Sequence, residues 1–192
     1  MTAMIPDDGL PLSRTLVLVG LMGAGKSCIG RRLAARLSMP FVDADTEIEK
    51  AAGCSVQDYF ARHGEAAFRQ GERRVMARLL DGPPLILASG GGAYVEAETR
   101  RLIAERAISL WLRADIDLLI KRTSGRDHRP LLKNGDPHAV FSRLIAERHP
   151  IYAQADLVVD SHDQPPEATV EMVMEALRRH LAGCPMSDEV NP

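Results

Sequence analysis

The chain has 192 residues, of which 45% are apolar, and its 24 basic and 26 acidic residues give a formal net charge of −2. This length and apolar fraction suffice for the core of one domain. The near-neutral charge and the aromatic content of 4% exclude a broad nucleic-acid-binding or anionic-membrane-binding surface, so any anion site must be local.

Residues 1–13 are rich in proline, glycine and aspartate and show no periodicity, so we expect a flexible extension there. They lack the basic start and apolar segment of a secretory signal, and no later apolar run approaches the roughly 20 residues that span a bilayer. The three cysteines, Cys28, Cys54 and Cys184, have no C-x-x-C spacing. These features favour a cytoplasmic protein without a membrane partner.

From Arg14 onward, short apolar segments alternate with longer amphipathic ones. The expected strands are residues 15–20, 41–45, 84–89, 108–112 and 156–160. Alternation of strands with helices predicts right-handed crossovers and a parallel sheet, and strands that are apolar on both faces predict helices on each side. We therefore expect one α/β domain at residues 14–183, a three-layer αβα sandwich with a five-stranded parallel sheet, followed by a flexible tail at residues 184–192.

The segment GLMGAGKS, residues 20–27, follows the first expected strand and matches G-x-x-x-x-G-K-[ST]. In such a loop successive backbone N–H groups face phosphate oxygens. Lys26 would reach the β and γ phosphates, and the Ser27 hydroxyl would bind Mg²⁺. A plain glycine turn with a solvated Lys26 is the alternative, but the strand-loop-helix context favours a nucleoside triphosphate site.

The second expected strand ends in FVDAD, with Asp43 and Asp45 two residues apart. In an extended chain both side chains leave the same face, at the sheet edge where the glycine-rich loop also lies. One carboxylate could fix Mg²⁺ through water while the other accepts a proton from an acceptor hydroxyl. Alternatively, Asp45 or Thr46 caps the next helix, because TEIE at residues 46–49 matches a capping box.

Two further motifs follow along the chain. GEAAFRQGE, residues 64–72, places Arg69 and Glu72 three apart on a helix, where a surface ion pair is the default interpretation. SGGG, residues 89–92, follows the third expected strand. Three consecutive glycines lose more backbone entropy than a plain turn requires, which favours close approach of the backbone to a ligand.

Residues 123–137, TSGRDHRPLLKNGDP, break the periodicity and predict a mobile lid. Arg122 precedes this segment, and Arg126 and Arg129 lie within it. Lid arginines can close over a triphosphate and stabilise charge in the transition state, although solvated loop charges are the alternative. The next expected helix carries Arg148 near its end, where a cation also complements the helix dipole.

With these motifs in this order, the chain resembles shikimate kinases over about residues 14–182. The motifs that carry the resemblance are GLMGAGKS, DAD, GE..FR..E, SGGG, RPLL and R.P.Y. The family has a P-loop NTPase-type fold with a five-stranded parallel sheet and a lid. It transfers the γ-phosphate of ATP to the 3-hydroxyl of shikimate with Mg²⁺ as cofactor. The resemblance thus implies ATP and shikimate as ligands, and we expect a monomer.

The resemblance also implies roles for individual residues. The catalytic residues would be Lys26, Asp43, Asp45 and Arg129, with the base left open between Asp45 and Asp43. The substrate contacts would be Asp45, Arg69, Gly90, Gly91, Gly92 and Arg148. The ATP contacts would be Gly23, Ala24, Gly25, Lys26, Ser27, Cys28, Arg122, Arg129 and Gln164. Ser27 and Asp43 would hold the metal, and Glu72 would support Arg69.

Two alternative functions remain beside this one. A kinase for another small hydroxy acid, such as gluconate, would share the phosphate loop and the compact α/β fold. A non-catalytic, regulatory ATP-binding module would lack at least one of Lys26, Asp45, Arg69 and Arg148, and the sequence retains all four.

Overall fold

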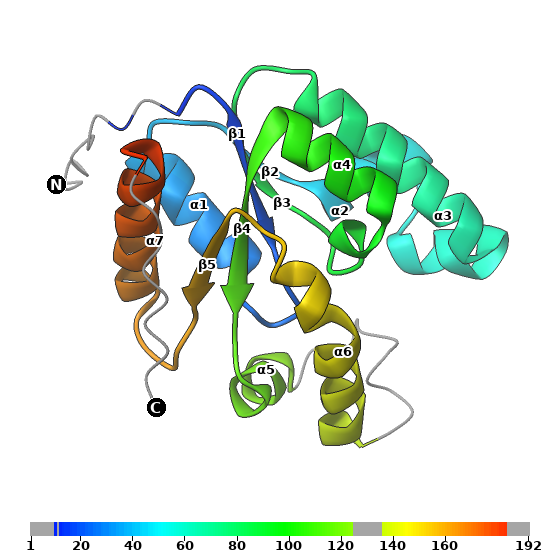
Figure 1. Ribbon diagram of the computed structural model, residues 1–192. Coiled ribbons are helices and arrows are strands. Elements are labelled where there is room, and N and C mark those ends of the chain that lie inside the picture. Colours follow the sequence, from blue (N-terminus) through cyan, green and yellow to red (C-terminus); the bar gives the residue numbers. More distant parts are fainter. Residues whose placement is uncertain (1–9, 11, 125–135, 184–192) are drawn as a thin grey trace, which may run out of the picture.

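The computed structural model describes residue 10 and residues 12–124 and 136–183. These residues form a five-stranded sheet in the order β2-β3-β1-β4-β5, with every neighbouring pair parallel (Figure 1). The strands are β1 (Thr15–Val19), β2 (Phe41–Asp43), β3 (Ile86–Ala88), β4 (Ala107–Arg113) and β5 (Leu157–Asp160). The expected five-stranded parallel sheet is thereby confirmed.

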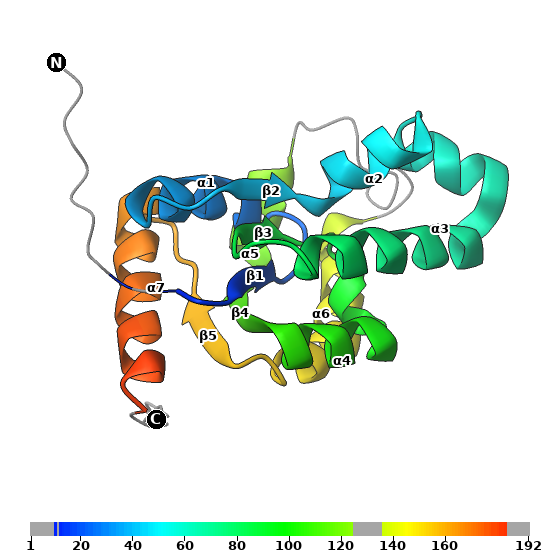
Figure 2. The ribbon, with the colours of Figure 1, turned by 90° about the horizontal axis from the view of Figure 1, so that it is seen from above.

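Helices cover both faces of the sheet, as the apolar strands require. Figure 2 shows α1 and α7 on one face and α3 and α4 on the other, which gives the three expected layers. The helices are α1 (Lys26–Arg36), α2 (Ala44–Ala52), α3 (Val56–Leu80), α4 (Ala97–Arg106), α5 (Ile116–Thr123), α6 (Pro137–Tyr152) and α7 (Pro166–Leu181), with a short 3-10 helix η1 (Ala93–Val95). Among the described residues, no helix is both long and apolar enough to cross a membrane.

The core is built around the central strand β1, in which every residue is buried. Leu16 of β1 lies in register with Ile86 of β3 and Ile108 of β4, and all three side chains are at most 4% exposed. Burial on both faces explains why this strand reads as an unbroken apolar run. The rigid sheet then holds the loops at its carboxyl edge in fixed positions.

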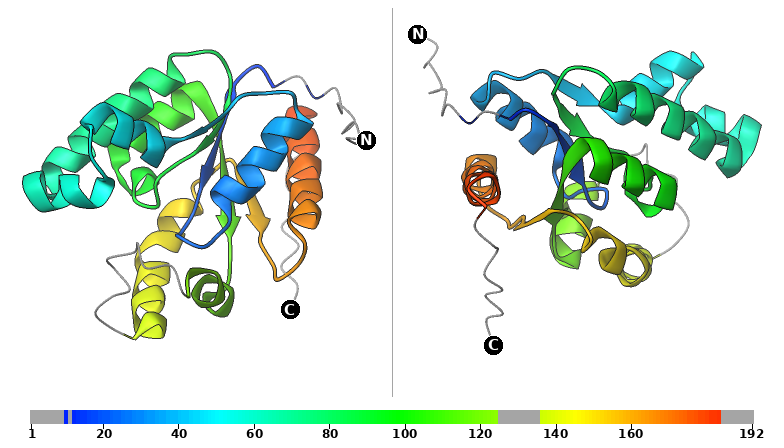
Figure 3. Two further views of the ribbon diagram at one scale, coloured as in Figure 1. Left: turned by 180° about the vertical axis from the view of Figure 1, so that it is seen from behind. Right: turned by 45° about the horizontal axis from the view of Figure 1, so that its top comes forward.

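Helices α2 and α3 extend beyond the sheet as an arm (Figure 3). α3 has a kink at Gly64, whose φ of 76° and ψ of 175° are not helical. Glycine reaches this positive φ without the clash that a side chain would introduce. The arm has a small apolar cluster of its own, formed by Ile48, Phe68 and Val75.

The end of β2 differs from the expectation. The strand stops at Asp43, because the chain turns into α2 at Ala44 and Asp43 becomes the N-cap residue. One Asp43 oxygen accepts the backbone N–H of Asp45 at 3.1 Å. The prediction that Asp43 and Asp45 leave the same face of an extended strand is therefore wrong, and so is the alternative that Asp45 or Thr46 provides the cap.

Most of the expected N-terminal extension, most of the expected lid and the expected tail lie outside the described residues. The helix expected from Pro137 is present as α6. It continues past Arg148 to Tyr152 with Pro150 inside it.

Candidate active site

A cavity of about 1250 Å³ lies at the carboxyl ends of the strands. Its walls come from the loop after β1, the ends of β2, β3 and β5, and helices α1, α2, α3, α5, α6 and α7. Among the residues expected in a site, it is lined by Gly23, Gly25, Lys26, Ser27, Cys28, Asp43, Asp45, Arg69, Gly90, Gly91, Gly92, Arg122 and Arg148. Motifs far apart in the sequence thus meet in one place.

The loop after β1 is shaped by glycines that adopt positive φ. Gly25, the N-cap of α1, has a φ of 100° and no capping side chain, so no side chain accepts hydrogen bonds from the first turn. Gly20 has a φ of 134°, and a Cβ there would lie 2.6 Å from the Leu112 carbonyl oxygen. The Lys26 ammonium donates to the Gly20 and Leu21 carbonyls at 2.7 and 3.0 Å. An uncapped helix start beside an ammonium suits phosphate.

Ser27 and Asp43 meet across the cavity floor. The Ser27 hydroxyl donates to Asp43 Oδ2 at 2.7 Å. A hydroxyl beside a carboxylate supplies the hard oxygen ligands that Mg²⁺ prefers. The described part of the chain contains no group of three or more His, Cys, Asp and Glu that could hold a metal ion. This composition fits a cation held by one carboxylate together with phosphate oxygens, which is how Mg²⁺ is commonly bound.

Arg69 and Glu72 form a buried ion pair, not the surface pair that their spacing suggests. Arg69 Nη1 donates to Glu72 Oε2 at 2.6 Å, and Glu72 is 2% exposed. Burial raises the pKa of Glu72, although the hydrogen bond from Arg69 opposes that rise. Burial lowers the pKa of Arg69, but the carboxylate partners outweigh burial and its pKa is raised overall. Arg69 therefore stays cationic in the cavity wall.

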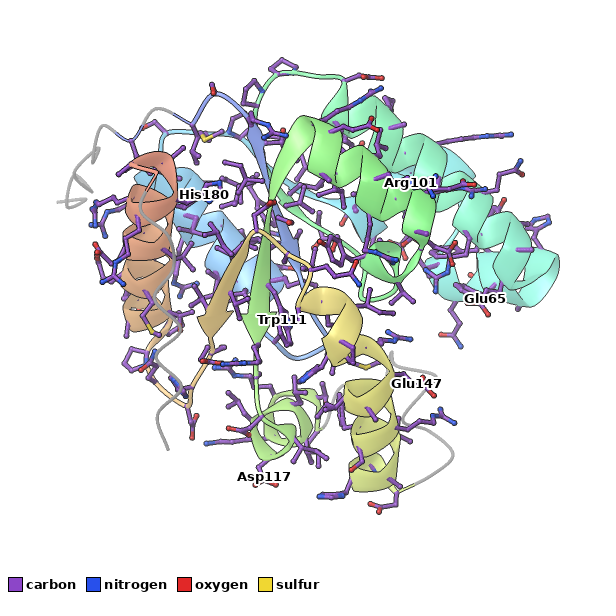
Figure 4. All side chains as sticks on the ribbon, in the orientation of Figure 1. Glu65, Arg101, Trp111, Asp117, Glu147 and His180 are labelled. Carbon is purple, nitrogen blue, oxygen red and sulfur yellow. The ribbon has the colours of Figure 1, made fainter. Side chains whose placement is uncertain are left out.

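A second carboxylate lies at the outer edge of the same guanidinium. Arg69 Nη2 donates to Glu65 Oε1 at 3.4 Å, and the Glu65 side chain is 70% exposed. Glu65 lines the cavity from α3, and Figure 4 labels it on that helix. The guanidinium thus faces one buried and one exposed carboxylate.

The three glycines after β3 allow side chains to approach the backbone closely. A Cβ at Gly92 would lie 2.5 Å from Arg69 Nη2, and a Cβ at Gly90 would lie 2.7 Å from Asp45 Oδ1. At Gly91 the nearest atoms would be 3.8 Å away. A side chain at Gly90 or Gly92 would therefore displace the carboxylate of Asp45 or the guanidinium of Arg69, which the sequence did not indicate.

Arg148 and Tyr152, both from α6, meet the Gly91 carbonyl oxygen. Arg148 Nη1 donates to this oxygen at 3.1 Å, and the Tyr152 hydroxyl donates to the same oxygen. Arg148 lines the cavity, whereas Tyr152 is fully buried behind it. We assigned no role to Tyr152 from the sequence, although it is the tyrosine of the R.P.Y motif.

On the nucleotide side, Arg122 connects the glycine-rich loop with the loop after β5. It donates to Ser161 Oγ and to the His162 carbonyl, both at 2.9 Å, and reaches the Ala24 carbonyl at 3.5 Å. Ala24 itself is buried and does not line the cavity. Arg126 and Arg129 lie outside the described residues.

Gln164 does not line the cavity. Its side-chain amide donates to Thr169 Oγ1 at 3.4 Å, and Thr169 lines the cavity in its place together with Pro166. These two residues of α7 are better placed than Gln164 to contact the base of a bound nucleotide. The sequence could not separate them, because Gln164 lies only two residues before Pro166, the first residue of α7.

An apolar wall opposite the phosphate loop was also missed. It consists of Val56, Phe60 and Phe68 of α3, and the rings of Phe60 and Phe68 have centroids 4.3 Å apart. The apolar face of a long amphipathic helix was the only sequence signal for this wall. From the sequence alone, such residues would be assigned to the core.

Comparison with known proteins agrees with this geometry. The family model described as shikimate kinase matches residues 22–178. A shikimate kinase of Paramagnetospirillum magneticum is 64% identical over 170 residues, which cover 88% of this chain and 87% of the relative. The structure of shikimate kinase from Acinetobacter baumannii in complex with shikimate is 31% identical with a TM-score of 0.86, over 91% of this chain and 98% of that one.

A more distant structure bears on the gluconate alternative. A gluconokinase from Sinorhizobium meliloti shares the fold with a TM-score of 0.61 at 16% identity, over 89% of this chain and 95% of that one. The shared fold therefore does not distinguish the two acceptors, and the residues of the cavity must do so.

Proposed function

We propose that this chain, which belongs to the shikimate kinase family and is thus an ATP-dependent kinase acting on shikimate, transfers the γ-phosphate to the 3-hydroxyl in the cavity described above. One observation carries the assignment of the site. The phosphate loop shares a single cavity with Asp45 and with two arginines, Arg69 and Arg148, that suit a carboxylate. Donor and acceptor groups of the reaction can therefore be held in contact.

For the donor half, we assign the phosphates to the uncapped start of α1 and to Lys26. The backbone N–H groups of the loop would bind the β and γ phosphates, and the helix dipole would favour their negative charge. The position of Arg122 beside Ala24 supports a contact with the nucleotide. Cys28, on the first turn of α1, lines the same part of the cavity.

Mg²⁺ is the cofactor that the donor set fits. Ser27 and Asp43 would hold it, and when bound it neutralises the charge that develops on the transferred phosphoryl group. Asp43 also caps α2 through its other oxygen, so its side chain is held in a fixed orientation. Together these contacts support Asp43 as a metal-holding residue.

For the acceptor half, we assign Asp45 as the general base. The Asp45 side chain is exposed and lines the cavity close to Gly90, and Asp43 bonds to Ser27 and to the Asp45 N–H. Arg69 and Arg148 would bind the substrate carboxylate, since the planar guanidinium matches it in two-point geometry. Binding at these points would orient one ring hydroxyl toward the γ-phosphate.

Exclusion of water must accompany transfer, because water is a competing acceptor. We expect Arg129, which lies outside the described residues, to act on the triphosphate from the lid. The cytoplasmic location, the monomeric state and the contact of Gln164 with ATP likewise stay predictions.

The direct test is ADP release in a coupled assay with millimolar shikimate or gluconate as acceptor. We expect stimulation by shikimate and none by gluconate, and the reverse result would overturn the proposal. Asp45→Asn should retain ATP binding, measured by calorimetry, and lose phosphoryl transfer. Unchanged turnover of this variant would exclude Asp45 as the base. A non-catalytic module would release no ADP with either acceptor.

A further inference from the structure

Tyr152 is the largest fully buried side chain of the described residues, yet its hydroxyl reaches the wall of the active-site cavity. It is the last residue of α6, and its ring lies among Tyr94 and Trp111, with centroids 6.3 and 5.9 Å away. Figure 4 labels Trp111, which lies on β4. A buried phenol whose hydroxyl bonds at a cavity wall is more than a space-filling core residue.

The hydrogen bonds of the glycine turn show what this hydroxyl does. The Gly90 carbonyl accepts the Ala93 N–H at 3.2 Å, and the Gly92 carbonyl accepts the Val95 N–H at 3.0 Å. These two carbonyls are thus held within the turn itself. The Gly91 carbonyl instead bonds to α6, through the Tyr152 hydroxyl and Arg148 Nη1.

The shared acceptor links Tyr152 to the proposed carboxylate ligand. Two donors on one carbonyl fix its direction, and through it they fix the guanidinium of Arg148. Burial raises the pKa of Tyr152, so its hydroxyl remains protonated and able to donate at neutral pH.

We infer that Tyr152 is a positioning residue for the acceptor substrate: its hydroxyl holds the Gly91 carbonyl and thereby orients both the glycine turn and Arg148 toward the substrate carboxylate. This inference rests on the proposed function. It concerns recognition of the acceptor, because Tyr152 does not line the cavity and the hydrogen bond of its hydroxyl goes to the glycine turn.

The test is Tyr152→Phe, which removes only the hydroxyl. The Gly91 carbonyl keeps Arg148 as a donor, so no buried acceptor is left unpaired and the variant should fold. The KM for shikimate should rise about 3- to 10-fold, the range expected for one neutral hydrogen bond, with unchanged KM for ATP. Thermal unfolding of the variant confirms that the fold is retained.

Tyr94→Phe is the matched control. Tyr94 belongs to the same aromatic cluster and is 4% exposed, but the donors to the Gly91 carbonyl are Tyr152 and Arg148. A general loosening of the cluster would affect both variants alike. We expect the KM for shikimate to change in Tyr152→Phe and to stay unchanged in Tyr94→Phe.

Two outcomes would overturn the inference: an unchanged KM for shikimate in Tyr152→Phe, or equal rises in the KM values for ATP and shikimate. A double-mutant cycle with Arg148→Lys gives a second test that does not depend on the size of either single effect. Since Tyr152 acts through Arg148, the two effects should be less than additive, and full additivity would contradict the inference. If the wild-type enzyme itself does not phosphorylate shikimate, the proposed function is wrong. This outcome differs from a failure of the inference about Tyr152, in which the wild type is active and Tyr152→Phe keeps its KM for shikimate.

Discussion

The Arg69 guanidinium donates a 2.6 Å hydrogen bond to the Glu72 carboxylate, of which only 2% is exposed. Gly92 lies against the same guanidinium, so close that a Cβ would be 2.5 Å from Nη2. Arg69 is thus held by Glu72 on one side and lies against Gly92 on another, and it lines the cavity. A cation held in this way loses little entropy when it binds a carboxylate.

Arg69→Lys should raise the KM for shikimate about 10- to 100-fold and leave the KM for ATP unchanged. Lysine keeps the charge but loses the planar two-point geometry, and such a change is equivalent to about 1.4–2.8 kcal/mol. Steady-state kinetics with each substrate varied in turn measures it. Arg73→Lys is the control, because Arg73 lies on the same helix but pairs with Glu98 of α4 outside the cavity. Equal effects of both variants would argue against the role of Arg69.

Gly92→Ala should displace the Arg69 guanidinium and raise the KM for shikimate by about tenfold or more, because the added methyl overlaps two of its nitrogens. The helical Gly71 provides the contrast, since a Cβ there meets nothing within 4 Å. Gly71→Ala is expected to keep wild-type kinetics, and Gly91→Ala to have a smaller effect than Gly92→Ala. A Gly92→Ala enzyme with wild-type KM would show that Arg69 does not need its observed position.

Asp43→Asn should raise the Mg²⁺ concentration required for half-maximal turnover by about tenfold or more, because the proposed metal site would lose the negative charge of Asp43. Asparagine is also a good N-cap, so α2 should remain intact. Asp115→Asn is the matched control, since Asp115 caps α5 by accepting the Leu118 N–H at 2.7 Å, away from the cavity. Turnover is measured over a Mg²⁺ titration at saturating ATP, and identical titrations for both variants would remove Asp43 from the metal site.

Glu72 predicts a pH dependence of stability. Burial raises its pKa above the unfolded value of about 4.3, so the folded state binds its proton more tightly. The free energy of unfolding contributed by this residue is therefore highest below the unfolded pKa and falls as pH rises through the folded pKa. Urea unfolding should show the wild type losing stability relative to Glu72→Gln over that window. A difference that stays constant or grows with pH would contradict a raised pKa.

Glu65→Gln should lower the KM for shikimate, by about threefold or less, because the exposed carboxylate competes with the substrate for Arg69 Nη2. Screening should reduce the effect at high salt. Glu175→Gln removes a comparable exposed carboxylate, paired with Arg179 at 3.0 Å on α7, and should have no effect. A higher KM for Glu65→Gln would mean that Glu65 orients Arg69 and does not compete.

The sheet could be predicted from the sequence because buried parallel strands have a clear signal, and the strand ends lie close to those expected. The end of β2 could not be predicted, because the sequence DAD is compatible both with an extended chain and with a helix cap. Only the turn at Ala44 decides between them. Local sequence does not encode that choice, which depends on where α2 packs.

In the site, the phosphate loop could be predicted because its residues are adjacent in sequence. Contacts between residues that are far apart in the sequence could not be predicted. The close packing against Gly90 and Gly92 comes from Asp45 and Arg69, which approach from α2 and α3. From the sequence alone, Tyr152 would be assigned to the apolar core. Only the position of α6 shows that its hydroxyl bonds to the Gly91 carbonyl.

The small apolar cluster of Ile48, Phe68 and Val75 adjoins the main core around β1 through Leu79, which packs against both. A cluster of this size supports only local cooperativity, so the arm of α2 and the first part of α3 should open without global unfolding. Amide hydrogen exchange in α2 would then be much faster than in β1. Substitutions in the arm can therefore change acceptor selectivity with little effect on the melting temperature, which leaves acceptor recognition free to evolve separately from nucleotide binding.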